Sequence, residues 1–444
     1  MKVKISTSPN FIIIYSILIL DFGFTSILNI PVLGVYANYT LVITIAIFLM
    51  FFNTIVNNNI YNTLKPYRNY TNAILIIISV FIVVVTLYSY NKYGQRFINY
   101  YSCFRTYLYL FLAVPLIFVF TKQNGYEYFL KALTVLTVVY LVFCFINSFY
   151  FTLRGSLLFE NLTFGLRNDR LRCQVPSSFY IIMPYVLNKI FDEKLNKDKL
   201  KWVALFGFFV FFIYYVCMTR MITVALYALI AVTLVVRPKD PNIRRTILIL
   251  YAIVFIILIV TGQVSNILEY FQSRDETFDQ STIARQKSLQ YFRGIAAANP
   301  ILSMGFVSPT NDYFASIYFG PKLNCFYDDL GISNIYLHYG LFGVVVFSFI
   351  ILRFAYLFIK IYFINKSEHK ALFAGIVLFI IFTQVSLSMF DGQRIMGASV
   401  LWALFEYEAY TTSATSQNDR KKRIQIRRNN ENHTIQLRMD KSRR

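Results

Sequence analysis

The chain has 444 residues, of which 57% are hydrophobic and only 15% are charged, and its formal net charge is +21 at pH 7. This composition excludes an ordinary water-soluble enzyme, because soluble domains carry about 25% charged residues. It is typical of a polytopic membrane protein, since each helix that crosses ~30 Å of hydrocarbon needs ~20 apolar residues with every backbone group bonded internally. The positive charge lies mainly in short connections and in the C-terminal tail, which indicates membrane orientation rather than nucleic-acid binding.

Twelve apolar segments follow one another, and only one connection between them is long. We predict membrane-spanning helices at 11–30, 36–56, 72–90, 105–121, 128–151, 176–191, 202–218, 221–236, 246–264, 332–352, 371–389 and 395–410. The sequence therefore predicts an all-α polytopic membrane protein. Residues 1–264 hold nine spans, 265–331 form a large external loop with short helices, 332–410 hold three spans, and 411–444 form a basic tail expected to be disordered.

The Lys and Arg residues predict how the chain is oriented. Twelve spans place both termini on one side, and 29 of the 43 Lys and Arg then lie on that side. The positive-inside rule makes this side cytoplasmic, so the long loop is external and, in a Gram-negative cell, periplasmic. The outer set holds 3 Lys but 11 Arg. Because a guanidinium grips phosphate in bidentate fashion, this bias favours a phosphate-recognising outer face. The alternative is that these arginines pair with loop carboxylates such as Asp169 and Asp275.

Two outward segments are marked by arginines close to a membrane entry. Arg167, Arg170 and Arg172 lie within six residues of one another, and Arg220 interrupts an apolar stretch of about 34 residues at a tight helical turn. A guanidinium at this depth needs an anionic partner, so both segments are candidate anion sites. The alternatives are an interfacial loop whose arginines reach lipid headgroups, and an arginine that only marks the turn.

A third candidate segment lies in the long loop. A helix is predicted from Ile283 to Ala298, after the N-cap candidates at 279–282 and before Asn299-Pro300, which stops it. Spacings of three and four residues place on one face Arg285, Leu289, Phe292, Arg293 and Ala296. Arg285 and Arg293 are two turns apart, so this helix could present two guanidinium groups to one ligand. The alternative is that they form its solvated face.

The fourth segment is the point at which the long loop re-enters the membrane. Asp328 and Asp329 lie there, and either carboxylate could act as a general base toward a sugar hydroxyl. His338 follows about two turns deeper, and a histidine inside a span is a functional candidate, with a packing role as the alternative. No metal-ligand spacing, Walker loop or dinucleotide fingerprint occurs, so we expect no metal and no other cofactor.

The five cysteines are scattered and form no Cys-x-x-Cys pair. Cys144 and Cys217 lie in apolar runs and are expected to be core residues. Cys103, Cys173 and Cys325 are expected on the outer side, which leaves one disulfide between two of them open.

Several of these features occur together in one known family. They are the hairpin Thr219-Arg220, the Arg285 helix that leads to Asn299–Phe306, and the re-entry motifs Asp329-Leu330-Gly331 and Gly340-Leu341-Phe342-Gly343. With about a dozen spans and one long late loop, the chain resembles the O-antigen polymerase (Wzy) family, within the O-antigen ligase and polymerase superfamily. The resemblance covers nearly the whole chain at the level of layout.

The resemblance implies a GT-C-like glycosyltransferase of the bacterial inner membrane that works without metal. A growing glycan on undecaprenyl diphosphate would be transferred to the non-reducing sugar of a new lipid-linked repeat unit. Asp329, Asp328 or His338 would act as the base. Arginines would bind the diphosphate or substrate, namely Arg167, Arg170, Arg172, Arg220, Arg274, Arg285, Arg293 and Arg394. Implied partners are the lipid-linked glycans and the bilayer, with a chain-length regulator and a flippase as further candidates.

Two alternative functions belong to the same pathway. A ligase of the superfamily carries a His followed by a polar residue at the re-entry point, where this chain has Ile332-Ser333, and this difference favours a polymerase. A flippase or other transporter would have short loops throughout and charges within its spans, whereas here the spans are almost free of charge and one loop is long.

Overall fold

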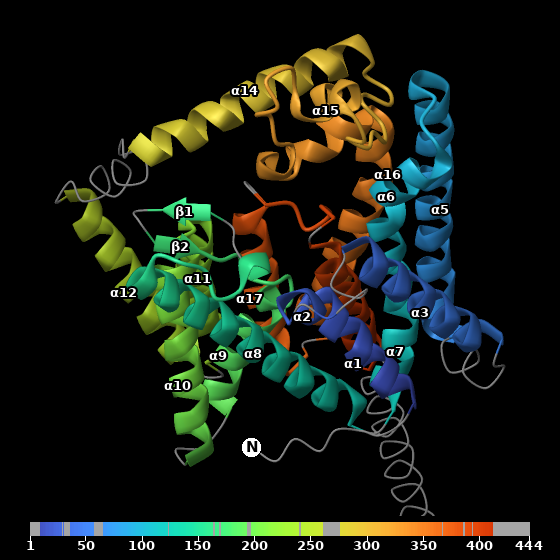
Figure 1. The fold of residues 1–444 in the computed structure, drawn as a ribbon. Helices are drawn as coiled ribbons and strands as arrows, with labels where there is room; N and C mark the ends of the chain where they lie inside the picture. Colours follow the sequence, from blue (N-terminus) through green and yellow to red (C-terminus); the bar gives the residue numbers. More distant parts are fainter. Residues whose placement is uncertain are drawn as a thin grey trace, which may run out of the picture.

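The computed structural model of the chain is built almost entirely of helices (Figure 1). The residues that the structure describes are 9–28, 30, 36–56, 65–122, 124–162, 165–167, 170–192, 197–238, 241–260, 276–365, 367–384, 387–392 and 394–411. Arg274 and the basic tail from residue 412 onward lie outside them. So do the side chains of Arg167 and Asp329, although the backbone of both residues is described.

The first part of the chain is a succession of apolar helices that ends in a small hairpin. The elements are α1 (Pro9–Asp21), α2 (Phe24–Ile27), α3 (Tyr36–Val56), α5 (Lys65–Tyr93), α6 (Phe97–Phe104), η1 (Arg105–Leu112), α7 (Ala113–Thr121), α8 (Gly125–Arg154), η2 (Glu160–Leu162), β1 (Gly165–Arg167) and β2 (Arg170–Arg172). The strands β1 and β2 pair antiparallel, with Arg167 opposite Arg170. They are the only sheet within the described residues.

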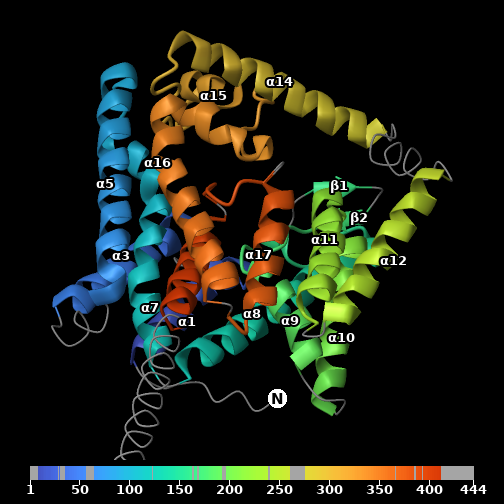
Figure 2. The ribbon, with the colours of Figure 1, turned by 180° about the vertical axis from the view of Figure 1, so that it is seen from behind.

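The second part begins with more apolar helices and then holds the long loop. The elements are α9 (Phe179–Asp192), α10 (Lys197–Phe212), η3 (Ile213–Cys217), α11 (Arg220–Val236), α12 (Pro241–Val260), α14 (Glu276–Ala298), α15 (Asp312–Phe319), η4 (Asp328–Leu330), α16 (Ser333–Ile359), η5 (Lys360–Ile364), α17 (Lys370–Thr383) and a helix over 395–411. Figures 1 and 2 show α14 running across one end of the molecule, above α15 and beside the start of α16.

Six helical stretches in the described part are long and apolar enough to cross a membrane, which confirms an all-α membrane protein. They are Asn38–Val56, Tyr70–Tyr93, Phe97–Thr121, Gly125–Arg154, Lys199–Cys217 and Ser333–Ile364. Shorter apolar helices cover Asn10–Asp21, Arg220–Val236 and Lys370–Thr383. Each of the twelve predicted segments is helical over most of its length. The number of twelve spans and their direction across the membrane stay predictions.

Several predicted boundaries differ from the observed ones. The first segment is broken after Asp21, because Gly23 takes a left-handed backbone with φ 70° and a new short helix begins at Phe24. Helix α14 begins at Glu276, seven residues earlier than predicted, but it ends before Asn299-Pro300 as expected. Helix α16 contains a non-helical residue, Gly340, that the hydropathy pattern did not reveal.

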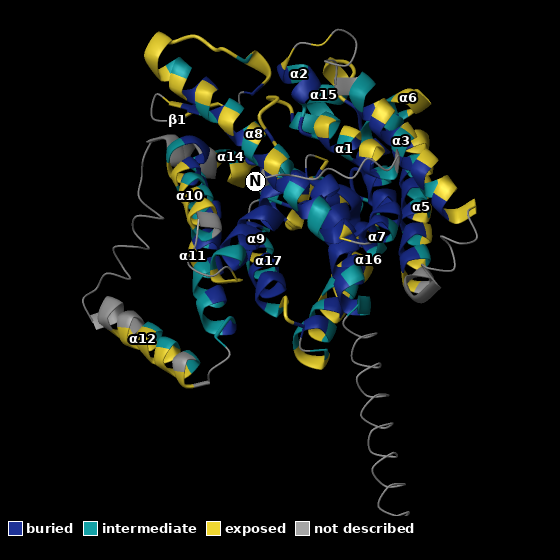
Figure 3. Ribbon diagram, turned by 90° about the horizontal axis from the view of Figure 1, so that it is seen from below, coloured by how far each residue is buried: buried dark blue, intermediate teal, exposed yellow. Residues whose placement is uncertain are grey.

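The surface of the helix bundle is largely apolar, and its interior is rich in aromatic rings. Large apolar side chains that are more than half exposed occur on α3, α5 and α16, for example Leu49, Ile76 and Leu352. Such exposure suits a lipid environment, in which no water has to be excluded from these side chains. Figure 3 shows exposed residues along the outer helices, while the central part of the bundle is buried. Inside, the Phe81 ring contacts Tyr107 at 5.8 Å and Tyr339 at 5.1 Å between ring centroids, linking α5, η1 and α16.

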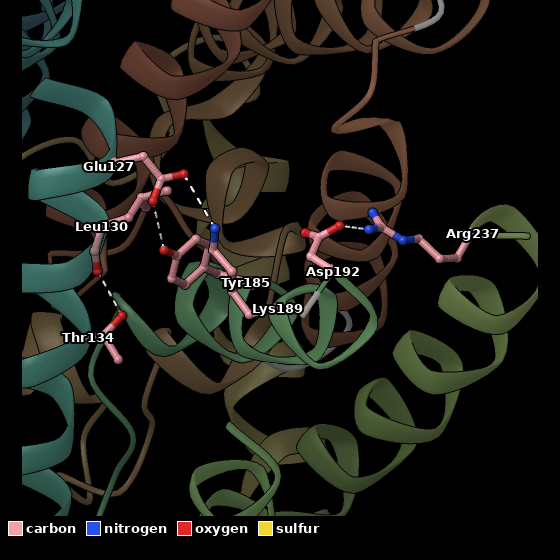
Figure 4. A network of polar contacts seen from close by, with 7 residues as sticks. All are labelled: Glu127, Leu130, Thr134, Tyr185, Lys189, Asp192 and Arg237. Atoms are coloured by element: carbon pink, nitrogen blue, oxygen red, sulfur yellow. Dashed lines mark hydrogen bonds and ion pairs between the residues drawn. The ribbon is translucent and has the colours of Figure 1, made fainter. Parts of the chain in front are cut away.

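Polar contacts join three helices at the end of the bundle opposite α14 (Figure 4). The Tyr185 hydroxyl donates to Glu127 Oε2 at 3.2 Å, and Lys189 Nζ lies 3.5 Å from Glu127 Oε1. Arg237 at the end of α11 pairs with Asp192 at the end of α9. These side chains are partly exposed, and each such pair contributes about 0–1 kcal/mol. They tie α8, α9 and α11 together on the side that the sequence predicts to be cytoplasmic.

All five cysteines are free. The Cys173 thiol donates to the Leu162 carbonyl oxygen at 3.1 Å, and Cys325 is 5% exposed within the loop subdomain. The disulfide that the sequence left open is therefore not formed.

Candidate active site at the re-entry of helix α16

The segment that follows α14 returns to the bundle and docks on the start of α16. The Leu341 and Phe342 amides donate to the carbonyl oxygens of Pro300 and Ile301, at 2.8 and 3.0 Å. This pairing requires Gly340. Its φ is 62°, and a Cβ there would lie 2.5 Å from the Ile301 carbonyl carbon and oxygen. The break in α16 thus lets two backbone segments meet, and it fixes the residues on either side of it.

Helix α5 holds the other side of the same segment. The Tyr88 hydroxyl donates to the Ser303 carbonyl oxygen at 2.8 Å, and Lys92 Nζ donates to the same oxygen at 3.0 Å. The Phe306 amide donates to Ser89 Oγ at 2.8 Å. The Ser303 hydroxyl closes the arrangement by donating to the Leu337 carbonyl oxygen at 2.5 Å. Residues 299–306 therefore connect α5 and α16 through hydrogen bonds on both sides.

His338 lies on the first turns of α16 and is 4% exposed. Its ring stacks on Tyr339, with ring centroids 4.3 Å apart. It also makes a T-shaped contact with the Tyr327 ring, with centroids 4.7 Å apart. Neither ring nitrogen has a hydrogen-bond partner among the described residues. A buried imidazole normally satisfies at least one nitrogen, so His338 is a candidate to contact a ligand or an ordered water.

Asp328 begins the short helix η4 and lies among tyrosines. Burial raises the pKa of the Tyr318 hydroxyl, and the Asp328 carboxylate raises it further. Burial likewise raises the pKa of Tyr327, with added contributions from Tyr318 and Asp328. The hydroxyls of Tyr318 and Tyr327 bond to each other. A half-buried carboxylate near the end of the bundle is a candidate proton acceptor.

A buried ion pair lies next to this tyrosine cluster. Arg394 pairs with Asp391 in the connection between α17 and the last helix, and their side chains are 4% and 0% exposed. Asp328 lies within electrostatic range of Arg394 and of Tyr107, and the hydroxyls of Tyr107 and Tyr339 are 2.8 Å apart. The structure therefore brings together three residues singled out from the sequence, Asp328, His338 and Arg394, around a shared group of tyrosines.

The hairpin arginines form a second group, around the turn between η3 and α11. Arg172 donates from Nε to the Cys217 carbonyl oxygen at 2.9 Å and from Nη2 to Thr219 Oγ1 at 2.8 Å. The exposed Arg170 guanidinium lies 4.8 Å from the centre of the Tyr215 ring. Arg220 is the first residue of α11 and is half-buried. Arg172 is thus partly occupied in holding the turn, whereas Arg170 presents its guanidinium at the surface.

The two arginines of α14 do not share its packed face. Phe292 and Ala296 are buried against Met304, Val307 and the rest of the loop subdomain. Arg285 and Arg293 are both exposed, whereas Leu289 is partly buried. Arg285 and Phe292 are seven residues apart, which is almost two full turns, so they point in similar directions from α14. That the two arginines face one ligand stays a prediction.

Two residues of the site were missed by sequence reasoning, Asp391 and Tyr107. Asp391 ends an apolar run, and a single carboxylate at such a position is a signal that could have revealed it. Tyr107 was missed for another reason, because a tyrosine within an aromatic-rich span carries no distinguishing mark.

Comparison with known proteins adds no assignment. No protein-family model matches the chain, and no curated protein matches it.

Proposed function

We propose that the protein is an O-antigen polymerase, which joins undecaprenyl-diphosphate-linked repeat units at the periplasmic face of the bacterial inner membrane. Twelve spans with both termini in the cytoplasm, and a metal-independent GT-C type reaction, belong to this proposal. The observation that supports it most is the presence of a carboxylate and a guanidinium close to each other where the chain enters α16. A half-buried carboxylate, Asp328, lies within electrostatic range of a buried guanidinium, Arg394, in a polar group at the loop end of an otherwise apolar bundle.

The reaction needs one proton acceptor and one stabiliser of negative charge. The acceptor sugar hydroxyl attacks the anomeric carbon of the glycan on the lipid diphosphate, and its proton passes to a carboxylate. The bond between the anomeric carbon and the diphosphate oxygen breaks, and undecaprenyl diphosphate leaves. Asp328 or Asp329 would accept the proton, and His338 is the further candidate. Guanidinium groups aimed at the departing diphosphate would stabilise its charge, which is the usual largest contribution to such catalysis.

The outer arginines lie at three positions relative to this centre. Arg394 lies within it, while Arg170 and Arg220 belong to the hairpin group and Arg285 is exposed on α14. We assign the diphosphate to the exposed arginines, because Arg394 is already paired with Asp391. Arg167 and Arg274 stay in the proposal on the strength of the sequence alone.

The test is the lipopolysaccharide of a deletion strain complemented with matched variants. Wild type is expected to restore the long ladder, whereas Asp328→Asn, Asp329→Asn and Arg285→Ala leave core bearing one repeat unit or a strongly shortened ladder. Asp312→Asn and Lys287→Ala are the matched controls. Asp312 is an exposed carboxylate of the same loop region, and Lys287 is an exposed cation on the opposite side of α14 from Arg285.

Each possible gel pattern decides between functions. A normal ladder in the deletion strain would end the polymerase proposal. Long polymer that stays on the lipid carrier would indicate a ligase, and loss of all outer-face repeat units would indicate a flippase. Full rescue by every variant would leave the polymerase proposal standing and would reject the proposed roles of the substituted residues.

A further inference from the structure

A second polar position lies inside the bundle, apart from Asp328 and His338. A cavity of about 160 Å³ is lined by Asp21 and Phe22 at the end of α1, Tyr140 in α8, the segment 174–177 before α9, and Arg394. One buried water needs only about 10–15 Å³. The cavity therefore has room for a much larger polar group, of the size of a sugar ring.

Two charged groups on the cavity wall keep unused hydrogen-bonding capacity. Asp21 makes no hydrogen bond or ion pair with any described residue, so its carboxylate oxygens remain acceptors. Arg394 is 4% exposed, and its Nε has no partner among the described residues, although another of its nitrogens is paired with Asp391. Buried polar atoms are almost always satisfied, so an unpartnered guanidinium nitrogen beside a cavity indicates a ligand or ordered water there.

The charge of the lining does not favour an anionic occupant. The wall carries one carboxylate and one guanidinium, and the guanidinium is already paired with Asp391. No unpaired positive charge is therefore left in the lining for a diphosphate. A neutral polyol fits better, because its hydroxyls donate to Asp21 and accept from Arg394. The rings of Phe22 and Tyr140, with centroids 5.7 Å apart, supply the apolar surface that small-molecule sites combine with a few polar groups.

We propose that this cavity is a binding subsite for one sugar ring of the repeat unit, held by Asp21 and Arg394 and flanked by Phe22 and Tyr140. Arg394 belongs to both positions, because it lines the cavity and lies within electrostatic range of Asp328. A sugar in the cavity would therefore lie next to the proposed reacting centre without occupying it. The identity of the bound sugar rests on the proposed function. The existence of a binding site in this cavity does not.

The test measures binding of the free repeat-unit oligosaccharide of the source strain, released from its lipid by mild acid, to the purified full chain in detergent. Thermal stabilisation of the wild type is expected to rise with oligosaccharide concentration. Asp21→Asn keeps the shape of the side chain but removes its charge, and it is expected to weaken binding about 10-fold. Gln174→Ala, on another wall of the cavity, is expected to weaken it by a smaller factor. Asp312→Asn serves as the matched control and is expected to bind as the wild type does.

The same preparations separate this proposal from the polymerase proposal. In the extension of lipid-linked repeat units, Asp21→Asn is expected to raise the KM for the acceptor about 10-fold with a smaller change in kcat, whereas a folding defect would lower the amount of active protein. Equal oligosaccharide binding by wild type, Asp21→Asn and Gln174→Ala would overturn the subsite even if extension proceeds. Asp21-dependent binding without any extension by the wild type would keep the subsite and reject the polymerase. Absence of oligosaccharide binding by a wild type that still binds undecaprenyl diphosphate would also overturn the subsite.

Discussion

Two charged side chains inside the bundle, Arg353 and Glu406, pair with each other. Arg353 in α16 donates from Nε and Nη2 to the two carboxylate oxygens of Glu406, both at 2.7 Å, and the side chains are 12% and 3% exposed. Trp402 Nε1 adds a bond to the same carboxylate at 3.3 Å. The sequence assigned Arg353 to the cytoplasmic set, because it lies at the end of a predicted span, and this side stays a prediction. Its bidentate geometry makes it a strong link between α16 and the last helix.

Removing one partner of this pair is expected to be costly. Glu406→Gln leaves a buried guanidinium without its counter-charge, and we expect a loss of about 3–5 kcal/mol in the free energy of unfolding in detergent. Glu160→Gln, at an exposed position in η2, is expected to change it by less than about 0.5 kcal/mol. Denaturant unfolding of both variants checks the prediction, and equal stability of the two would contradict it.

At the scale of single helices, the break in α16 matters most for the site. It places His338 and Tyr339 before Gly340 and the apolar body of the helix after it, while residues 300 and 301 pair with the amides beyond the break. A continuous helix would use those amides internally and would leave the connector from α14 without its docking position. The local backbone of one glycine therefore determines how the long loop meets the bundle.

Gly340→Ala is expected to disrupt this junction. The Gly340 backbone, with φ 62° and ψ −159°, lies in a region that is essentially restricted to glycine and costs other residues about 1–3 kcal/mol. The added carbon would also lie within 2.6 Å of three backbone atoms. We expect a total loss of at least about 2 kcal/mol, with faster hydrogen exchange over residues 299–308. Gly294→Ala is the control, because it lies in α14 with nothing within 4 Å of its Cβ position, and it is expected to be neutral or slightly stabilising. Unchanged exchange in the first variant would argue against the role of the break.

At the scale of the whole molecule, the two ends of the bundle differ in character. The end with α14, α15 and the hairpin carries tyrosines and arginines, and the opposite end carries the Glu127, Lys189, Asp192 and Arg237 network. The orientation predicted from the distribution of Lys and Arg would place the end with α14 outside. The proposed reacting centre would then lie on the periplasmic side, as the proposed function requires.

Cysteine labelling tests the orientation directly. Asp312→Cys and Glu368→Cys, each exposed, are placed in a background in which the five native cysteines are serine. A membrane-impermeant maleimide is expected to label position 312 in cells with a permeabilised outer membrane and position 368 only after lysis. The reverse pattern would invert the orientation and place the tyrosine cluster in the cytoplasm.

Particular residues show how much of the candidate site could be predicted from the sequence. The re-entry motif led to Asp328 and His338, and the outer arginine bias led to Arg394, which the structure brings close to Asp328. The same bias also selected Arg172, which partly serves to hold a turn, and it overlooked Asp391 and Asp21. Residue type and position along the chain show where charge is unusual, but they do not show which charges meet.

The sequence by itself determined the class of the protein, the positions of its apolar helices and the place of its long loop. Those features follow from a local requirement, since each crossing of a bilayer needs a run of apolar residues. Only the tertiary structure decided which helices pack together, that Arg353 meets Glu406, and that residues 21, 140, 174–177 and 394 enclose one cavity. The physical reason is that both the lipid-facing and the core-facing sides of a span are apolar, so hydropathy carries almost no information about helix partners.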